Sequence, residues 1–278
     1  MPTKRIYVDS RFRLPGGTDS DFRYALKTPI ELPRGTVGWI DGVVISHSFN
    51  SVIQGHNDRL FVREVNGVSF DDRVLTIPAG DYNGYSLAET LEALLNVGTT
   101  LPQLWTVVFE SGMLTFGNAT PAASGGGYVI PREMIESGLG PQMTYWGHGM
   151  SPPPAPLSID GDASRLIGNL MGPAIAVNSS QSHTTEWIDL LPYHQLFLHS
   201  HIGAPTSQGP RGENTIARRI VVTGNPSDLI VDHLSTQMDH IELGEQLSTL
   251  HFSLRDVEGN LVDTRGHSIS FAICIPRD

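Results

Sequence analysis

The chain ends with residues 250–275, LHFSLRDVEGNLVDTRGHSISFAICI, and both flanks of this stretch alternate polar with apolar residues. Successive side chains of a β-strand point to opposite faces, so this period of two predicts strands at 251–254 and 268–273. Between them, Gly259 and Asn260 tolerate a positive φ, and Asp256 can hydrogen-bond the backbone of its own turn. The stretch therefore predicts strand, turn, strand.

A calcium loop is the alternative interpretation of the same letters, because carboxylate and amide oxygens crowd this turn. A helix–loop–helix calcium site needs ligands at alternate positions, a glycine at the sixth position and a glutamate at the twelfth. Counted from Asp256, Gly259 comes fourth, and the flanks have the period of strands. We therefore predict a turn and no metal.

Composition excludes several classes of protein. The 278 residues carry a net charge of −11. This charge argues against a general nucleic-acid binder, because such proteins present a dominant basic field. A single cysteine, Cys274, rules out an intramolecular disulfide and suits a reducing compartment. We expect no secretory signal and no membrane span, because no apolar run has the length that either needs.

The 29 glycines and 19 prolines punctuate the chain at short intervals, as in all-β sandwiches and barrels. Outside the inserted cassette the sequence contains eight strand-like segments, and we therefore predict an eight-stranded sandwich. They are 20–26, 38–49, 59–65, 185–190, 195–202, 217–223, 246–255 and 268–275. The chain thus divides into a flexible basic arm (1–19), a first part of the sandwich (20–72), an inserted α/β cassette (73–140), a long Pro/Gly-rich crossing loop (141–182) and a second part of the sandwich (183–278).

The cassette contains one clear helix. Ser86 is the predicted N-cap, with Glu89 completing a capping box, and the helix has an apolar face. That face consists of Leu87, Leu91, Leu94 and Leu95. A hairpin is predicted next, from 105–109 and 113–116, followed by a flexible glycine link at 124–127.

The first thirteen residues reverse the overall charge, since four basic residues meet only Asp9. A local reversal of this kind predicts a dedicated partner, either nucleic acid or an acidic protein surface. Apolar residues at even spacing favour a protein partner, because such a segment can add to the edge of a neighbour's sheet. The segment predicted to contact this partner consists of Lys4, Arg5, Ile6, Val8, Arg11, Phe12 and Arg13.

His199 and His201 are the sharpest metal candidates, because alternate residues of a strand face one side. A cupin-type oxygenase begins its metal site in this way, but it also needs a nearby Glu and a third His. The nearest Glu is Glu213, beyond a Gly/Pro loop, and the remaining histidines lack ligand spacing. We predict two ordinary histidines on a polar strand face, with no metal, no cofactor and no catalytic residues.

The order of three pieces resembles the penton, or minor capsid, proteins of virophages and polinton-like viruses. These pieces are IYVDSRFR followed by SDFRYAL, then LTIPAGDYNGYSLAETLEALLN with WTVVFESGMLTFGN, and finally the closing stretch quoted above. The resemblance spans nearly the whole chain.

This resemblance implies a single jelly-roll subunit that is not an enzyme. It implies a homopentamer at the five-fold vertices of an icosahedral virion, assembled inside the host cell and surrounded by a double jelly-roll major capsid protein. A vertex spike and packaged DNA are further implied partners. Two alternatives remain open: a cupin-like metalloenzyme using His199 and His201, and a β-sandwich module that binds carbohydrate or a receptor.

Overall fold

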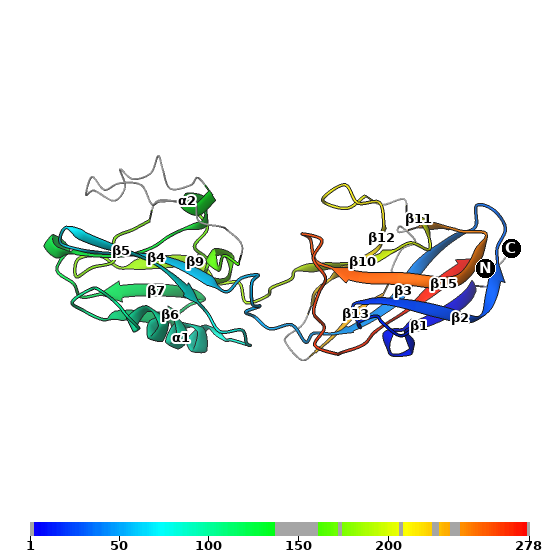
Figure 1. The fold of residues 1–278 in the computed structure, drawn as a ribbon, viewed down its shortest axis with the longest axis horizontal. Helices are drawn as coiled ribbons and strands as arrows, with labels where there is room; N and C mark the ends of the chain where they lie inside the picture. Colours follow the sequence, from blue (N-terminus) through cyan, green and yellow to red (C-terminus); the bar gives the residue numbers. More distant parts are fainter. Residues whose placement is uncertain are drawn as a thin grey trace. The chain divides into compact units, whose positions relative to one another are not determined.

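The computed structural model describes residues 3–136, 161–171, 174–205, 208–223, 228–233 and 240–276. The chain forms two compact units. Unit 1 combines residues from 1–49 and 193–278, and unit 2 is made from residues 50–192 (Figure 1). In the described part of the chain no helix has the length and apolar character to cross a bilayer.

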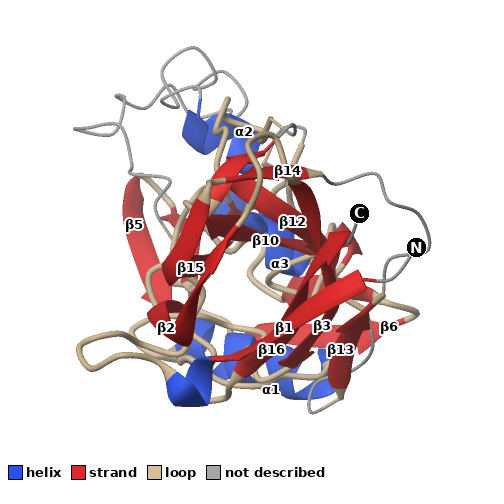
Figure 2. Ribbon diagram, turned by 90° about the vertical axis from the view of Figure 1, so that its right-hand side faces the viewer, coloured by secondary structure: helices blue, strands red, loops and turns tan. Residues whose placement is uncertain are grey.

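Unit 1 is built almost entirely from antiparallel strands. They are β1 (Thr3–Asp9), β2 (Asp21–Glu31), β3 (Val37–Ser46), β10 (Gln195–Ser200), β11 (Gly203–Pro205), β12 (Ile216–Val221), β13 (Leu229–Asp232), β14 (Ile241–Leu243), β15 (Gln246–Arg255) and β16 (Ile269–Pro276), with a 3-10 turn η1 (Ser10–Phe12) after β1. One sheet has the order β1-β16-β3-β14-β11, with β13 also paired to β3, and the other has the order β12-β10-β15-β2. Figure 2 shows β1, β16, β3 and β13 side by side.

The two sheets of unit 1 face each other as a sandwich. Phe252 of β15 meets Phe271 of β16 edge to face, with ring centroids 4.8 Å apart. Phe22 of β2 lies 5.7 Å from Phe252 and completes this aromatic contact. All three rings are almost fully buried, so the predicted strand 268–275 lies inside the core.

The N-terminal segment is a core strand, and the prediction of a flexible arm was wrong. β1 pairs antiparallel with β16 from Thr3↔Pro276 to Asp9↔Ser270. Ile6 and Val8 are 9% and 1% exposed, so the even-spaced apolar residues face the interior of their own sandwich. The alternation of apolar residues indicates a strand, and this strand pairs with β16 of the same chain.

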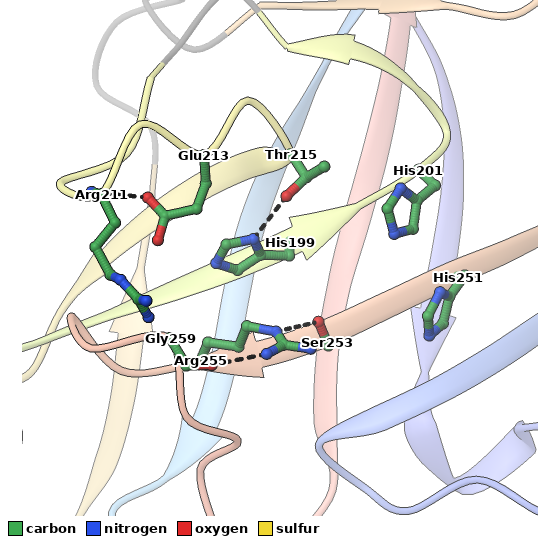
Figure 3. A pocket seen from close by; sticks show the side chains of 9 residues that line it. All are labelled: His199, His201, Arg211, Glu213, Thr215, His251, Ser253, Arg255 and Gly259. Carbon is green, nitrogen blue, oxygen red and sulfur yellow. Dashed lines mark hydrogen bonds between the residues drawn. The ribbon is translucent and has the colours of Figure 1, made fainter.

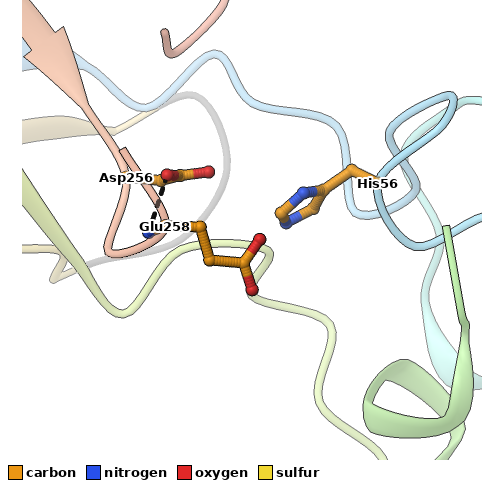
Figure 4. Close-up of side chains that lie close together, drawn as sticks. All are labelled: His56, Asp256 and Glu258. Atoms are coloured by element: carbon orange, nitrogen blue, oxygen red, sulfur yellow. Dashed lines mark hydrogen bonds between the residues drawn. The ribbon is translucent and has the colours of Figure 1, made fainter. Parts of the chain in front are cut away.

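The closing turn has the predicted form. The carboxylate of Asp256 accepts hydrogen bonds from the N–H groups of Glu258 (2.9 Å) and Asn260 (2.8 Å); Figure 4 shows the first of these. Gly259 has a φ of +84°, a conformation that glycine adopts without strain. The carboxylate of Asp256 thus holds its own turn, as the sequence predicted.

Unit 2 contains the α-helices found among the described residues and two further small sheets. Its elements are β4 (Arg59–Asn66), β5 (Ser69–Thr76), α1 (Gly84–Asn96), β6 (Trp105–Glu110), β7 (Met113–Asn118), η2 (Ala122–Ser124), β8 (Gly125–Val129), α2 (Arg132–Glu136), α3 (Ser164–Ile167) and β9 (His183–Trp187). The sheets have the orders β5-β4-β8 and β6-β7-β9. The predicted segments 59–65 and 185–190 therefore belong to unit 2, and their assignment to the sandwich was wrong.

The predicted boundaries of the inserted cassette were too narrow, because they left out β4 and β9. β4 pairs with β5 and β8, while β9 pairs with β7, so both strands share hydrogen bonds with the cassette. Their alternation identifies them as strands but carries no information on the partner strand. The insertion runs from Asn50 to Pro192.

Helix α1 begins earlier than predicted, because Asn83 is the N-cap. The Asn83 side chain accepts from the Ser86 N–H (2.9 Å), and Ser86 Oγ accepts from the Asn83 N–H (3.0 Å). Ser86 is thus the third helical residue of the capping box and not its cap. The predicted apolar face is confirmed for Leu87, Leu91 and Leu95, which are fully buried.

The predicted hairpin is confirmed, whereas the glycine link is a strand. Ser111 and Gly112 both have positive φ in the tight turn between β6 and β7. Residues 125–129 form β8 against β4. A Cβ at Gly127 would collide with the Trp105 ring, and one at Gly125 with the Val65 carbonyl. Glycine serves close packing here, so flexibility was the wrong interpretation.

A buried carboxylate lies at the centre of unit 2. Glu64 is fully buried and accepts hydrogen bonds from Arg73 Nη1 (2.7 Å) and Trp105 Nε1 (2.9 Å). It also accepts from the Thr100 N–H and from the Thr99 and Thr100 hydroxyls. Burial opposes the charge and would raise its pKa, but these hydrogen bonds hold the pKa of Glu64 below its ordinary value.

The predicted crossing loop lies partly outside the described residues, including Pro152, Pro153, Pro154 and Pro156. Its described end is ordered within unit 2. Leu166 and Ile167 of α3 are buried, and Val177 exchanges backbone hydrogen bonds with Gly127 (2.9 and 2.7 Å). This part of the loop contributes to the core.

Candidate assembly surface and histidine pocket

Strand β1 lies at one end of its sheet, so only one of its edges is paired within the described residues. Its odd-numbered side chains face outward: Arg5 is exposed and Tyr7 is 70% exposed. Phe12 of η1 is 72% exposed. An open strand edge beside exposed aromatic rings is a surface that another chain can pair with or cover.

The arginines of this segment are already paired, which corrects the prediction of an unmatched basic arm. Arg5 lies 3.6 Å from Asp41, Arg11 2.6 Å from Asp9 and Arg13 2.7 Å from Asp19. The hydrogen bond from Arg11 lowers the pKa of Asp9. Sequence counting missed Asp19 and Asp41, because they reach the segment only through the turn after η1 and through strand β3.

Beside β1 the surface is hollowed into a groove of about 500 Å³. Its lining includes Tyr7, Phe12 and Tyr24, together with Arg5 and Asp41. We call this the β1 groove. It combines apolar ring surface with one arginine and two carboxylates, those of Asp9 and Asp41, a mixed composition common at protein interfaces.

A second hollow, of about 390 Å³, contains both predicted metal candidates. Figure 3 shows His199, His201 and His251 around this histidine pocket, with Glu213 opposite His199. His201 stacks on His251 with ring centroids 5.5 Å apart. Sequence spacing could not show that His251 lies beside His201, because the two residues are brought together by the pairing of β10 with β15.

The imidazoles do not converge as metal ligands do. His199 Nδ1 is 2.9 Å from Thr215 Oγ1, and His251 Nε2 is 2.7 Å from Asp21 Oδ1. Among the described residues of unit 1, no three His, Cys or carboxylate ligand atoms lie within 4.8 Å of one another. The pocket thus brings together residues of a cupin-like set without the geometry of a cupin centre.

A buried histidine of unit 2 makes stability depend on pH. Burial lowers the pKa of His183 below 6.5, and its Nε2 is 3.0 Å from Asn169 Oδ1. The unfolded chain therefore binds a proton more readily than the folded chain, and the free energy of unfolding falls as the pH drops below about 6.5. We expect His183→Gln to remove part of this decrease in urea titrations at pH 7.5 and 5.5.

A matched control is His267→Gln, which removes a histidine from an exposed turn of unit 1. That variant should keep the wild-type pH dependence of unfolding. Equal pH dependence in wild type and His183→Gln would show that the buried imidazole is not the cause.

Comparison with known proteins extends these observations. No protein-family model matches the chain, and neither does any curated protein. Among solved structures, the chain is similar to the mavirus penton protein, with 8% identity and a TM-score of 0.50 over 98% of this chain and 99% of that chain. It also matches a chain in the Sputnik virophage structure determined by cryo-EM, with 12% identity and a TM-score of 0.46 over 98% and 97% of the two chains. The chain thus has the fold of the mavirus penton protein along its whole length.

Proposed function

We propose that the chain is a penton (minor capsid) subunit that forms homopentamers at the five-fold vertices of an icosahedral viral capsid. The observation that carries the proposal is the end-to-end match to a penton protein, covering 98% and 99% of the two chains. Sandwich folds serve many unrelated functions, so a match to unit 1 alone would say little. A match that also includes the inserted unit 2 is more specific.

The strand order of unit 1 supports a single jelly roll as the basis of this subunit. Taken in chain order, its eight longest strands are β1, β2, β3, β10, β12, β13, β15 and β16. The first, eighth, third and sixth share one sheet, and the second, seventh, fourth and fifth share the other. This is the arrangement of a jelly roll formed by two Greek keys.

Assembly into a ring requires a heterologous interface, in which one patch meets a different patch on the next subunit. Obligate interfaces of this type bury about 2,000 Å² or more. We propose that the β1 groove is one such patch, with Tyr7 and Phe12 covered by a neighbouring capsid chain. The neighbour is the next copy of the chain in the ring, and the exposed side chain of Arg5 contributes charge at the same place.

Native mass spectrometry of the purified chain, alone and with the major capsid protein, tests this proposal. We expect a species with five times the mass of the chain. The double variant Tyr7→Ser, Phe12→Ser should remain folded, because both side chains are exposed, and should lose this species. Loss of assembly is expected because the apolar area that the neighbour covers is removed.

The matched control is Tyr85→Ser in unit 2, since Tyr85 is 68% exposed and Tyr7 is 70% exposed. This variant should assemble like the wild type. A chain that stays monomeric at high concentration and beside its capsid partner would contradict the vertex function. A pentamer that tolerates the double variant would contradict only the role of the β1 groove.

A further inference from the structure

The histidine pocket has the size of a small-molecule site and lies entirely within unit 1. Its volume of about 390 Å³ falls in the range of ligand pockets, which span roughly 300–1,000 Å³. Its walls come from β10, β15, the turn after β15 and the segment before β12. Side chains from four separate parts of the sequence therefore point into one cavity (Figure 3).

Hydrogen-bond donors dominate the lining. Two guanidinium groups, of Arg211 and Arg255, face three imidazoles across the cavity, and Glu213 is the only carboxylate among the lining residues. Guanidinium groups remain protonated in proteins, so the lining is net positive even with neutral histidines. The protein as a whole carries a charge of −11, and the pocket is thus a local exception.

The donors are held in place by their own neighbours. Arg255 donates from Nε to Ser253 Oγ (3.1 Å) and from Nη1 to the Gly259 carbonyl (2.7 Å). The guanidinium of Arg211 donates to the Glu258 carbonyl, and its backbone N–H donates to Glu213 Oε2 (2.9 Å). A site whose donors are already ordered loses less entropy when it binds a ligand.

His199 adds a ring nitrogen to the lining of the pocket. Its side chain is 7% exposed, and its Nδ1 is fixed by Thr215. Within the described residues its Nε2 has no hydrogen-bond partner. When Nδ1 accepts from the Thr215 hydroxyl, Nε2 carries the proton and is a donor. A donor that faces the pocket in this way can hydrogen-bond an acceptor oxygen of a ligand.

We propose that the histidine pocket binds the phosphate or sulfate group of a small polar molecule. Tetrahedral oxyanions present several acceptor oxygens, which match the planar forks of Arg211 and Arg255 and the Nε2–H of His199. A metal ion is disfavoured by the two fixed cations. The cavity exceeds the size of a bare phosphate, and Glu213 is an acceptor for a hydroxyl on the rest of the molecule. This inference is independent of the proposed function.

Isothermal titration calorimetry with four probes tests the site: inorganic phosphate, inorganic sulfate, glucose 6-phosphate and unphosphorylated glucose. We expect saturable binding of glucose 6-phosphate with a Kd of about 1 mM or tighter, and no binding of glucose. Equal affinity for inorganic phosphate would identify the free anion as the ligand. Weaker binding of the free anion would show that the attached sugar contributes.

Arg211→Gln is the decisive variant, because Arg211 is exposed and its removal leaves the sheets of unit 1 intact. Loss of one charge-assisted hydrogen bond should weaken binding about tenfold. Arg219→Gln is the matched control, since it removes an arginine of β12 that is also exposed but does not line the pocket. Thermal unfolding without ligand checks that both variants are folded.

Three results would overturn the proposal. They are absence of saturable binding by every anion, equal weakening by Arg211→Gln and Arg219→Gln, and equal binding of glucose and glucose 6-phosphate. Equal weakening by both variants would mean that anion binding depends on the net charge of the protein and not on the pocket.

Discussion

Deletion of residues 1–13 is expected to leave unit 1 unfolded or insoluble. The deletion removes β1, whose buried Ile6 and Val8 each contribute about 1.5–3 kcal/mol. It also exposes the edge of β16, an apolar strand that β1 covers along its length. Ser10, whose Oγ accepts from the Ile269 N–H (3.0 Å), is lost as well. Because domains are stable by only about 5–15 kcal/mol, these losses together should prevent folding.

Yield of soluble chain and circular dichroism measure this effect. Val8→Asp and Tyr7→Asp form a matched pair, since the two positions are adjacent on β1 but are 1% and 70% exposed. The first variant should behave like the deletion and the second like the wild type. A soluble, folded chain lacking residues 1–13 would return the segment to the status of a detachable arm.

Replacement of Glu64 by Ala should lower the free energy of unfolding of unit 2 by about 3–5 kcal/mol, the usual cost of removing one partner from a buried ion pair. Arg73 is 11% exposed and would lose its carboxylate, although it keeps its bonds to carbonyls at the end of α1. The buried Trp105 Nε1–H would lose its acceptor. The carboxylate links β4 to Arg73 of β5, to Trp105 of β6 and to the segment that follows α1, so the loss should affect the whole unit.

Urea unfolding followed by circular dichroism gives the required free energies. Glu89→Ala is the control, because Glu89 lies exposed on α1 of the same unit and should change stability by less than about 0.5 kcal/mol. Glu64→Gln keeps an acceptor for Trp105 and should fall between wild type and Glu64→Ala. A loss below about 1 kcal/mol in Glu64→Ala would mean that water replaces the carboxylate, and that the ion pair is not structural.

Features that depend on neighbouring residues could be predicted from the sequence. The hairpin at Ser111 and Gly112 and the turn held by Asp256 involve groups within a few positions of one another. The apolar face of α1 follows from a spacing of four residues. The N-cap was misplaced because Asn83 and Ser86 bond reciprocally, so both have the side chain that a cap requires.

The candidate surfaces could be predicted only in part. His199 and His201 line one pocket, although β10 ends at Ser200, before His201. His251 and Arg255 join them through the pairing of β10 with β15. The arginines of the N-terminal segment were recognised, whereas their carboxylate partners Asp19 and Asp41 were not. In each case the missing group is brought in by another element.

The sequence by itself determined the hairpin β6–β7, the closing turn at Asp256 and the long helix, because the period of the apolar residues and the turn chemistry are local. Only the tertiary structure decided which sheet each strand enters. Alternation in IYVD marks a strand and its buried face, but the partner of Tyr7 is Ala272, at the opposite end of the chain. A strand exposes the same N–H and C=O groups whatever its side chains, so its partner is chosen by the fit of whole apolar faces in the assembled sandwich.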